Sequence, residues 1–346
     1  MRLLVLWPTS RCNLQCRYCY AAQVPPDDMD ISTARMAIET MKPPFKIQFS
    51  GGEPLLRADL MAEIMSYARF KNPGVSFALQ TNGTLLNEGV IGLLKQYHVA
   101  LGISLDGRTE INEYLRGKTR ELIRGIRLLG EAGLMVNINT VVCDVNVEKL
   151  HETADMAVYL GNVQGIALDP LRLVGRAKDR IAEIKPPSDS ALTRGLELLR
   201  LRVKEINALS PRKIRVREFE KAHYLKTAEV PCNDYCYAAQ GASFVILPNG
   251  ECCPCGSLAG MREYAMGNVR TGLKGLPLRY TRPQRCGVCS HQRYCNGACP
   301  ARFILNGNGD PDCSIKRYAF ENITRKEAFQ NPVDSEKVSK EKEGML

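Results

Sequence analysis

The chain has 346 residues and a mass of 38.5 kDa, which allows two domains or one large barrel with an appendage. Its composition, 45% hydrophobic and 24% charged residues, excludes global disorder. The net charge is +10, and +7 of it lies between Arg172 and Lys221. No apolar run approaches the ~18 residues of a spanning helix, and Leu3–Trp7 is too short for a signal-peptide core. We therefore expect a cytoplasmic protein without a membrane partner.

Six short apolar runs in the first half have the length and texture of buried parallel strands. They lie at Arg2–Trp7, Phe45–Phe49, Val75–Gln80, Val99–Leu105, Met135–Val142 and Gly165–Leu171. Helical patterns separate the runs, at Ser32–Met41, Asp59–Arg69, Asn87–Tyr97, Thr119–Ala132 and Val147–Leu160. About six βα units predict an α/β fold with a parallel sheet and outer helices. A full barrel needs eight units, so we expect an open, partial one.

The pattern changes after Lys185–Ser188. An amphipathic helix is predicted from Leu192 to about Ala208, and a Cys-, Gly-, Pro- and Asn-rich texture begins near Glu229. Within that texture, Ser243–Leu247 reads as a strand that enters a hairpin turn. We predict a barrel domain at 1–185, a linker with a helix at 186–228, a loop-rich metal-dependent domain at 229–330 and a mobile charged tail at 331–346.

Cysteine usage is the most informative part of the composition. Of 14 cysteines, three lie close together near the N-terminus, Cys143 is isolated, and ten lie between Cys232 and Cys313. Without a secretory signal, such clustering favours metal binding over disulfides. Histidine is scarce, with four residues, which favours all-thiolate ligation.

Cys12, Cys16 and Cys19 form a C-x3-C-x2-C motif in a loop after the first predicted strand. Three thiolates on one short loop suit three irons of a [4Fe–4S] cluster and leave the fourth iron open for a ligand. The alternatives are a closed cluster completed by a distant cysteine and a zinc site.

Further motifs follow the next strands in order. Gly51, Gly52 and Glu53 follow the second strand, Gln80-Thr-Asn-Gly follows the third, and Ser104 and Arg116 follow the fourth. With an aromatic residue, Tyr18, before the third cysteine, this set resembles the radical S-adenosylmethionine (radical SAM) superfamily. The glycines allow close approach of a backbone, and a carboxylate suits the ammonium group of methionine.

The resemblance implies a partial (β/α)6 barrel, SAM as cofactor, and SAM contacts by Tyr18, Gly51, Gly52, Glu53, Ser104 and Arg116. It implies that Ser104 and Arg116 approach the ribose and the carboxylate of SAM; the alternatives are a strand-end cap for Ser104 and a surface ion pair for Arg116. It also implies the reaction. A reduced cluster cleaves SAM to a 5′-deoxyadenosyl radical, which abstracts a hydrogen atom from an unactivated carbon. The protein positions the reacting groups, tunes the potential of the cluster and excludes solvent.

The C-terminal cysteine spacing resembles the SPASM domain, which carries two auxiliary [4Fe–4S] clusters in radical SAM enzymes. The resemblance assigns one cluster to Cys232, Cys236, Cys255 and Cys299, and the other to Cys286, Cys289, Cys295 and Cys313. A structural zinc site is the alternative for the second group. Cys252 or Cys253 could replace Cys255, although Cys255 keeps the Gly250-x4-Cys spacing. With eight ligands available, we expect the auxiliary clusters to transfer electrons.

Relatives in this family modify peptides and proteins, for example by crosslinking, thioether formation or epimerisation, or they oxidise or rearrange small molecules such as haem and antibiotic precursors. We expect a peptide or protein substrate, a small molecule as the alternative, and a non-catalytic Fe–S electron carrier as the least favoured case. An external one-electron reductant such as flavodoxin or ferredoxin is implied, and no nucleic-acid module is visible.

Three features bear on the substrate. Anaerobic sulfatase-maturating enzymes carry an Asp after the cysteine that matches Cys255, whereas this chain has Gly256, so we expect no formylglycine formation. The cluster loop begins at residue 12, so leader recognition is expected to need a separate protein or direct binding. The basic stretch Arg172–Lys221 suits an acidic leader, and the alternative is a solvated charged surface.

Overall fold

A computed structural model describes residues 2–227, 234–275 and 277–323. The fold is built on one sheet of nine strands in the order β7-β6-β5-β4-β3-β2-β1-β8-β9. All neighbours are parallel except β8 and β9, which pair antiparallel. The strands are β1 (Arg2–Leu6), β2 (Phe45–Phe49), β3 (Ser76–Thr81), β4 (Ala100–Ser104), β5 (Val136–Val142), β6 (Val163–Pro170), β7 (Arg215–Val216), β8 (Ser243–Ile246) and β9 (Cys252–Cys253).

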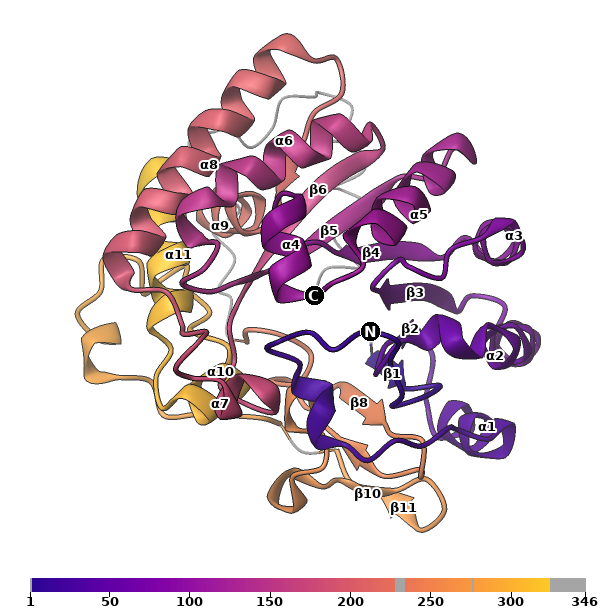
Figure 1. The fold of residues 1–346 in the computed structure, drawn as a ribbon. Helices are drawn as coiled ribbons and strands as arrows, with labels where there is room; N and C mark the ends of the chain where they lie inside the picture. The colour runs from indigo at the N-terminus through magenta and orange to yellow at the C-terminus, as the bar shows by residue number, and fades with distance from the viewer. Residues whose placement is uncertain (1, 228–233, 276, 324–346) are drawn as a thin grey trace.

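Helices connect the strands and cover the convex side of the curved sheet (Figure 1). The helices of the first part are α1 (Ile31–Glu39), α2 (Ala58–Lys71), α3 (Glu88–Gln96), α4 (Thr109–Leu115), α5 (Thr119–Glu131), α6 (Leu150–Leu160) and α7 (Arg176–Asp179). Those of the second part are α8 (Asp189–Leu209), α9 (Arg217–Thr227), α10 (Pro300–Asn306) and α11 (Asp310–Asn322). Side-chain oxygens cap several N-termini, as Asp30 caps α1, accepting from Thr33 N at 2.6 Å.

The two faces of the sheet differ in polarity, and this difference positions the site. In β2, Phe45, Ile47 and Phe49 are buried in the main core, whereas Lys46 and Gln48 alternate with them and stay half-exposed. The same alternation holds in β4, where Leu101 and Ile103 are buried. One face therefore packs on the helices, and the other is a polar, concave face.

The sequence prediction of an open α/β barrel with six βα units is confirmed, and all six strands lie within two residues of their predicted starts. The predicted strand at Ser243–Leu247 forms β8, but it pairs with β1 in the main sheet, with Leu3 opposite Ser243 and Leu6 opposite Ile246. The two parts of the chain thus share one sheet. Domain boundaries stay a prediction, and the predicted tail, 331–346, lies outside the described residues.

Among the described helices, none is long and apolar enough to cross a membrane. The C-terminal part, orange to yellow in Figure 1, runs below the N-terminal strands and up beside α8. Its regular elements are short: besides β8, β9, α10 and α11, two-residue strands β10 (Gly267–Asn268) and β11 (Gly272–Leu273) pair antiparallel.

Candidate functional site

The N-terminal cysteine loop lies between β1 and a 3-10 turn at Tyr20–Gln23, at the carboxyl end of the sheet. Its backbone is fixed at both ends. Arg17 N donates to Leu115 O at 2.9 Å, and Cys19 N donates to Cys16 O at 3.2 Å. Cys16 is buried, Cys19 half-buried and Cys12 exposed. The three thiols therefore lie at different depths, with Cys12 at the surface and Cys16 in the interior.

The three thiols lie within electrostatic reach of one another. Burial raises the pKa of Cys16 to about 12; Arg116 opposes that shift, and Cys19 and Cys12 add to it. Burial also raises the pKa of Cys12, against the backbone N–H of Leu14, which donates to its sulfur at 3.4 Å. A metal bound here would replace the thiol protons and offset the repulsion between the thiolates.

No three Cys, His, Asp or Glu side chains in residues 2–227, 234–275 and 277–323 surround the position of a single metal ion. In an iron–sulfur cluster each thiolate binds a different iron. The donor set, three thiols on one loop, fits the SAM-binding cluster.

Gly51 and Gly52 bring the loop after β2 onto the cysteine loop. Gly52 N donates to Thr9 O at 3.1 Å and Glu53 N to Arg11 O at 2.8 Å. A Cβ on Gly52 would lie 2.0 Å from Arg11 O, and Gly51 has φ +122°. Only glycine fits such an approach. Because the glycines have no side chain, the backbone at Thr9 and Arg11, where the cysteine loop begins, packs directly against them.

Glu53 is buried and organises the loop after β3. Its Oε1 accepts from Thr81 Oγ1 at 2.6 Å and Leu55 N at 3.1 Å, and its Oε2 accepts from Asn82 N at 2.8 Å. Burial raises the pKa of this carboxyl, although the three hydrogen bonds oppose that shift. A carboxylate has about four acceptor positions, so one remains for an ammonium group.

Tyr18 and Arg116 meet on a residue to which the sequence assigned no role, Asp106. Arg116 Nε donates to Asp106 Oδ2 at 2.8 Å, and Tyr18 OH donates to the same oxygen. The Arg116 guanidinium lies 5.2 Å from the centre of the Tyr18 ring. The ion pair is buried, with side chains 10% and 0% exposed. Arg116 therefore forms an interior ion pair, not the surface pair of the alternative interpretation.

Ser104 joins a row of polar side chains on the concave face. Gln80 Nε2 donates to Ser104 Oγ at 3.1 Å, and Asn139 Nδ2 donates to Gln80 Oε1. A Cβ on Gly102 would lie 2.4 Å from Gln80 Oε1 and 2.7 Å from Asn139 Nδ2, so both amides cover Gly102. The row crosses three strands and offers donors and acceptors to a ligand above the sheet.

The structure brings together three of the cysteines assigned to the first auxiliary cluster. Cys236, Cys255 and Cys299 lie in or against one small cluster that also contains Ala238 and Leu258. Burial raises the pKa of Cys255, and the nearby Cys299 and Cys236 raise it further. The fourth assigned residue, Cys232, lies outside the described residues.

Cys252 and Cys253 point elsewhere. They form β9, so their side chains leave opposite faces: Cys252 packs in the main core and Cys253 packs with Trp7 and Val245. Burial raises the pKa of Cys252 to about 12. Of these three cysteines, Cys255 is the one beside Cys299, which favours the spacing-based choice.

The second assigned group is also brought together in part. Burial raises the pKa of Cys313, Arg285 and Arg317 oppose the shift, and Cys295 and Cys286 add to it. Cys289 N donates to Cys286 O at 3.4 Å. Cys143 is fully buried and packs beside Cys16 and Tyr18, as a small apolar residue does.

Gly256 lies against the N-terminal region. A Cβ there would stand 3.4 Å from Trp7 Cζ2 and 3.5 Å from Tyr20 Cε2. The rings of Trp7 and Tyr20 lie 6.3 Å apart between centroids. Tyr20 follows Cys19, and Gly256 follows Cys255, so these aromatic rings bridge the two cysteine regions.

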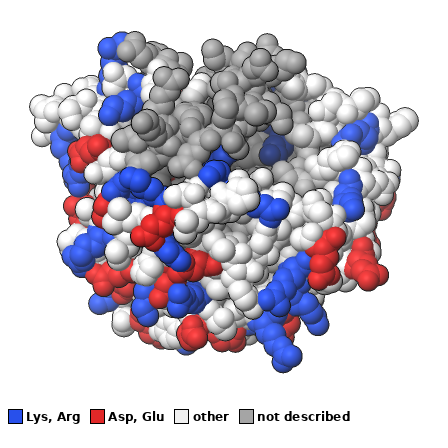
Figure 2. Space-filling view, turned by 90° about the horizontal axis from the view of Figure 1, so that it is seen from above, with Lys and Arg blue, Asp and Glu red and all other residues white. Residues whose placement is uncertain are grey.

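The basic stretch is extensively paired. Arg194 lies 2.5 Å from Glu148 and Arg202 lies 2.7 Å from Asp155. Lys213 Nζ donates to Ser210 O at 3.0 Å near the C-terminus of α8. On the face in Figure 2, blue and red side chains are interleaved. Groups of the chain itself therefore offset part of the positive charge of this stretch.

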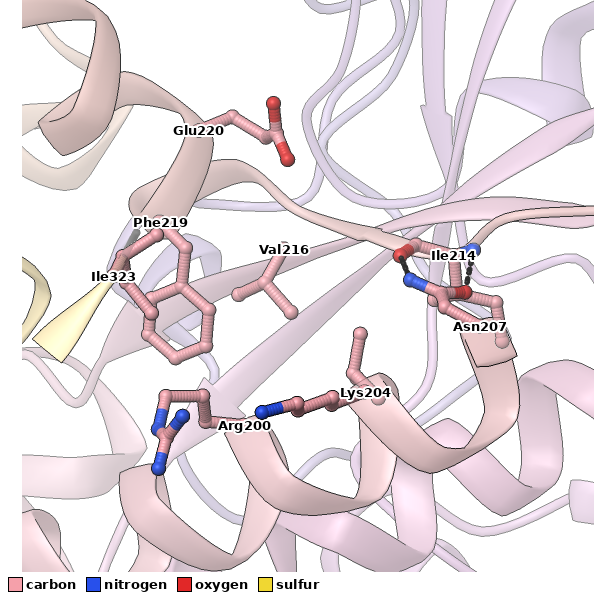
Figure 3. Close-up of a pocket in the computed structure, with 9 residues that line it drawn as sticks. Arg200, Lys204, Asn207, Ile214, Val216, Phe219, Glu220 and Ile323 are labelled. Atoms are coloured by element: carbon pink, nitrogen blue, oxygen red, sulfur yellow. Dashed lines mark hydrogen bonds between the residues drawn. The ribbon is translucent and has the colours of Figure 1, made fainter. Parts of the chain in front are cut away.

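A small pocket lies between α8, β7 and α9 (Figure 3). Asn207 closes one side, since its amide donates to Ile214 O at 2.9 Å and accepts from Ile214 N at 2.8 Å. Arg200 and Lys204 project from α8 toward Val216 and Phe219. None of the described residues that line it belongs to the predicted site.

Sequence reasoning missed a group of charged residues between the two cysteine regions: Asp169, Arg172, Arg302 and Asp312. Burial disfavours the Asp169 charge, but Arg172 and Arg302 beside it overcome that effect and lower its pKa to about 2. The opposite charges of Asp169 and Arg172, three residues apart at the end of a predicted strand, could have indicated an ion pair. Nothing in the sequence indicates that Arg302 is their partner.

Comparisons with known proteins agree with this geometry. The Radical SAM superfamily model matches residues 8–157. An uncharacterised protein of Methanocaldococcus jannaschii is 32% identical over 280 residues, which cover 78% of this chain and 89% of that protein. A serine-type anaerobic sulfatase-maturating enzyme of Klebsiella aerogenes is 27% identical over 333 residues, covering 86% and 79%. An AdoMet-dependent heme synthase of Methanosarcina barkeri is 33% identical over 171 residues, covering 46% and 48%.

Among solved structures, anSMEcpe with bound AdoMet and Kp18Cys peptide shares the fold. Its TM-score is 0.76 at 21% identity, and the match covers 93% of this chain and 98% of that one.

Proposed function

Since the chain belongs to the radical SAM superfamily, we propose that it is an enzyme that modifies a peptide or protein. Cys12, Cys16 and Cys19 hold the SAM-binding cluster. The C-terminal cysteines would hold two auxiliary clusters, which would supply electron transfer between the substrate and an external one-electron carrier. When bound, SAM and its cluster supply the one-electron chemistry that removes a hydrogen atom from carbon.

The extent of the similarity carries this proposal. The sulfatase-maturating relative aligns with 86% of the chain, whereas the heme synthase aligns with 46%. The concave face adds support, because amides such as Gln80 and Asn139 both donate and accept hydrogen bonds. A peptide backbone presents the same two kinds of group.

Each residue of the site has a task in this proposal. Glu53 receives the ammonium group of SAM with its remaining acceptor position. Arg116, held by Asp106, fixes Tyr18 beside the cysteine loop and keeps a positive charge near Cys16. The hydroxyl of Ser104 hydrogen-bonds the ribose. The buried side of the loop keeps water from the reacting atoms.

A small molecule is the second candidate. The observation in its favour is the higher identity, 33%, to a heme synthase over part of the chain. A non-catalytic electron carrier is disfavoured, because a carrier has no need of a SAM pocket. Such a carrier would require neither the close packing of Gly52 on the Arg11 backbone nor the buried Glu53 beside the cysteine loop.

The deciding experiment follows deuterium. The reconstituted enzyme is incubated with SAM, a reductant and either deuterated peptides encoded by short reading frames beside the gene or deuterated tetrapyrroles. We expect a peptide to transfer deuterium into 5′-deoxyadenosine, and the Cys12→Ala/Cys16→Ala/Cys19→Ala variant to transfer none. Transfer from the tetrapyrrole with none from any peptide would overturn the peptide assignment.

A separate test addresses formylglycine. The Gly256 position lacks the carboxylate of the sulfatase-maturating relatives, so sulfatase-derived peptides with Cys or Ser at the target are expected to stay unmodified. Mass spectrometry after incubation reads this out. A Cys-to-aldehyde change, or loss of two hydrogens from Ser, would contradict the expectation.

A further inference from the structure

Arg172 is a residue of the barrel that reaches the C-terminal cysteines. It lies just after β6, and its Nη2 stands 4.0 Å from the sulfur of Cys299. Its positive charge also opposes the rise in the pKa of Cys255 that burial causes. The side chain is only 18% exposed. A guanidinium is always protonated in proteins, so a fixed positive charge faces two of the sulfurs assigned to the first auxiliary cluster.

Asp169 holds Arg172 in this position. Its Oδ2 accepts from Arg172 Nη1 at 2.6 Å, and its Oδ1 accepts from Arg302 Nη2 at 2.5 Å. Arg302 is buried and donates through Nε to Pro170 O at 2.8 Å. The carboxylate is thus shared by two cations, and it keeps a partner if Arg172 is replaced.

The same network continues into the C-terminal part. Arg302 also donates to Asp312 Oδ1, which accepts from Tyr235 OH at 2.9 Å. Tyr235 precedes Cys236, another assigned ligand of this cluster. The charges therefore connect the end of β6 to the loops that carry the C-terminal cysteines.

We propose that Arg172 is a positioning residue that raises the reduction potential of the auxiliary cluster at Cys236, Cys255 and Cys299. The inference rests on the proposed function for the presence of that cluster. The potential of an iron–sulfur cluster depends on nearby charge and on hydrogen bonds to its sulfurs. A guanidinium favours the reduced cluster, which carries one more negative charge, and an N–H aimed at Cys299 withdraws electron density from it.

The effect suits a cluster that accepts electrons from the barrel. The cluster would take one electron from the substrate radical that hydrogen-atom abstraction leaves, and it would pass this electron to the external carrier named above. A proton lost from the substrate in that step goes to solvent. A higher potential favours the first transfer and disfavours the second, so Arg172 sets the balance between them.

The test is a redox titration of the full-length holoenzyme, followed by electron paramagnetic resonance of the auxiliary clusters. We expect Arg172→Met to keep its iron and to raise the ratio of oxidised to reduced cluster at least tenfold at a fixed potential. For a one-electron couple, tenfold corresponds to about 59 mV. Arg172→Lys keeps the charge and is expected to recover most of the wild-type titration.

Arg217→Met is the matched control. Arg217 also lies near Asp169, but it donates to Glu218 and Leu168 O, and no cysteine is among the groups that shift its pKa. We expect its titration to match the wild type. An unshifted titration of iron-replete Arg172→Met overturns the proposal. An equal shift in Arg217→Met also overturns it, because the effect would then be general.

The iron content separates this inference from the function on which it rests. If Cys299→Ala binds as much iron as the wild type, the cluster assignment fails. If Cys299→Ala loses about four irons and Arg172→Met still titrates as the wild type, the role of Arg172 alone fails. If Arg172→Met folds poorly, Arg172→Gln and Arg172→Lys carry the comparison, with the smaller shift expected for lysine.

Discussion

The two cysteine regions are held in different ways. The N-terminal loop is short, follows a buried strand and is fixed by backbone hydrogen bonds from Gly52 and Glu53 to Thr9 and Arg11. The C-terminal cysteines lie mostly on loops, with Cys313 in α11, and ion pairs of the buried Arg302 with Asp169 and Asp312 lie beside them. One region is held by backbone contacts to the sheet, whereas the other has few such contacts and is supported by side-chain ion pairs.

This difference teaches where metal matters for the structure. Backbone contacts to the sheet form on folding, so we expect the N-terminal loop to keep its shape without iron. Loops with few hydrogen-bonded elements gain their order from ligation, since metal binding to such sites is coupled to folding. The predictions below test that contrast, beginning with the largest effect.

Loss of the N-terminal ligands is expected to abolish activity while leaving the fold. The Cys12→Ala/Cys16→Ala/Cys19→Ala variant should retain about eight of about twelve irons and produce no 5′-deoxyadenosine. Circular dichroism should match the wild type, because the loop is held by its backbone. Remaining SAM cleavage would contradict the assignment, and a lost fold would contradict the contrast between the regions.

Gly52→Ala is expected to damage the same loop through the backbone. Its Cβ would lie 2.0 Å from Arg11 O, and such overpacking costs about 1–3 kcal/mol or more. Thermal unfolding and SAM affinity should both fall. Gly92→Ala is the matched control: it lies in α3 with nothing within 4 Å of its Cβ, and alanine there should stabilise by about 1 kcal/mol.

Replacing Cys255 sharpens the comparison on the C-terminal side. Cys255→Ala should lose about four irons and lower the protease resistance of the C-terminal loops. Cys252→Ala removes a thiol of β9 that packs in the main core, and it should keep all iron. Iron analysis distinguishes them, and iron loss in Cys252→Ala with none in Cys255→Ala would reverse the ligand choice.

The basic stretch is expected to give the smallest effect. Exposed ion pairs are worth ~0.2–1 kcal/mol each, so Arg212→Gln/Arg215→Gln should weaken binding of an acidic hexaglutamate peptide roughly two- to thirtyfold. The loss should vanish at 1 M salt, where charges are screened within about 3 Å. Fluorescence anisotropy measures this. Binding unaffected by both salt and substitution would leave the stretch as a solvated surface.

Much of the barrel was predictable because its strands are local in sequence. The run Phe45–Phe49 matches β2 residue for residue, and the run Met135–Val142 differs from β5 by one residue. Helices α4 and α9 were missed, since their apolar periodicity is short. The cysteines and Gly51–Glu53 were found because short motifs carry their chemistry.

The remaining parts of the site depend on contacts between distant segments. Asp106 joins Tyr18 to Arg116, and no spacing in the sequence indicates that Tyr18 would donate to it. Asp169 and Arg302 are 133 positions apart. Pairing of β8 with β1 was likewise invisible, because a strand run predicts a strand and not its neighbour.

That pairing has a consequence for biosynthesis. Leu3 leaves the ribosome 240 residues before its partner Ser243. At the usual elongation rate of 5–20 residues per second, the delay is roughly 10–50 seconds. During it, one edge of β1 has unpaired backbone groups, a feature that attracts other chains. The growing chain can therefore pair wrongly with other chains during this period. The period ends when β8 emerges and pairs with β1, the strand that leads into the cysteine loop.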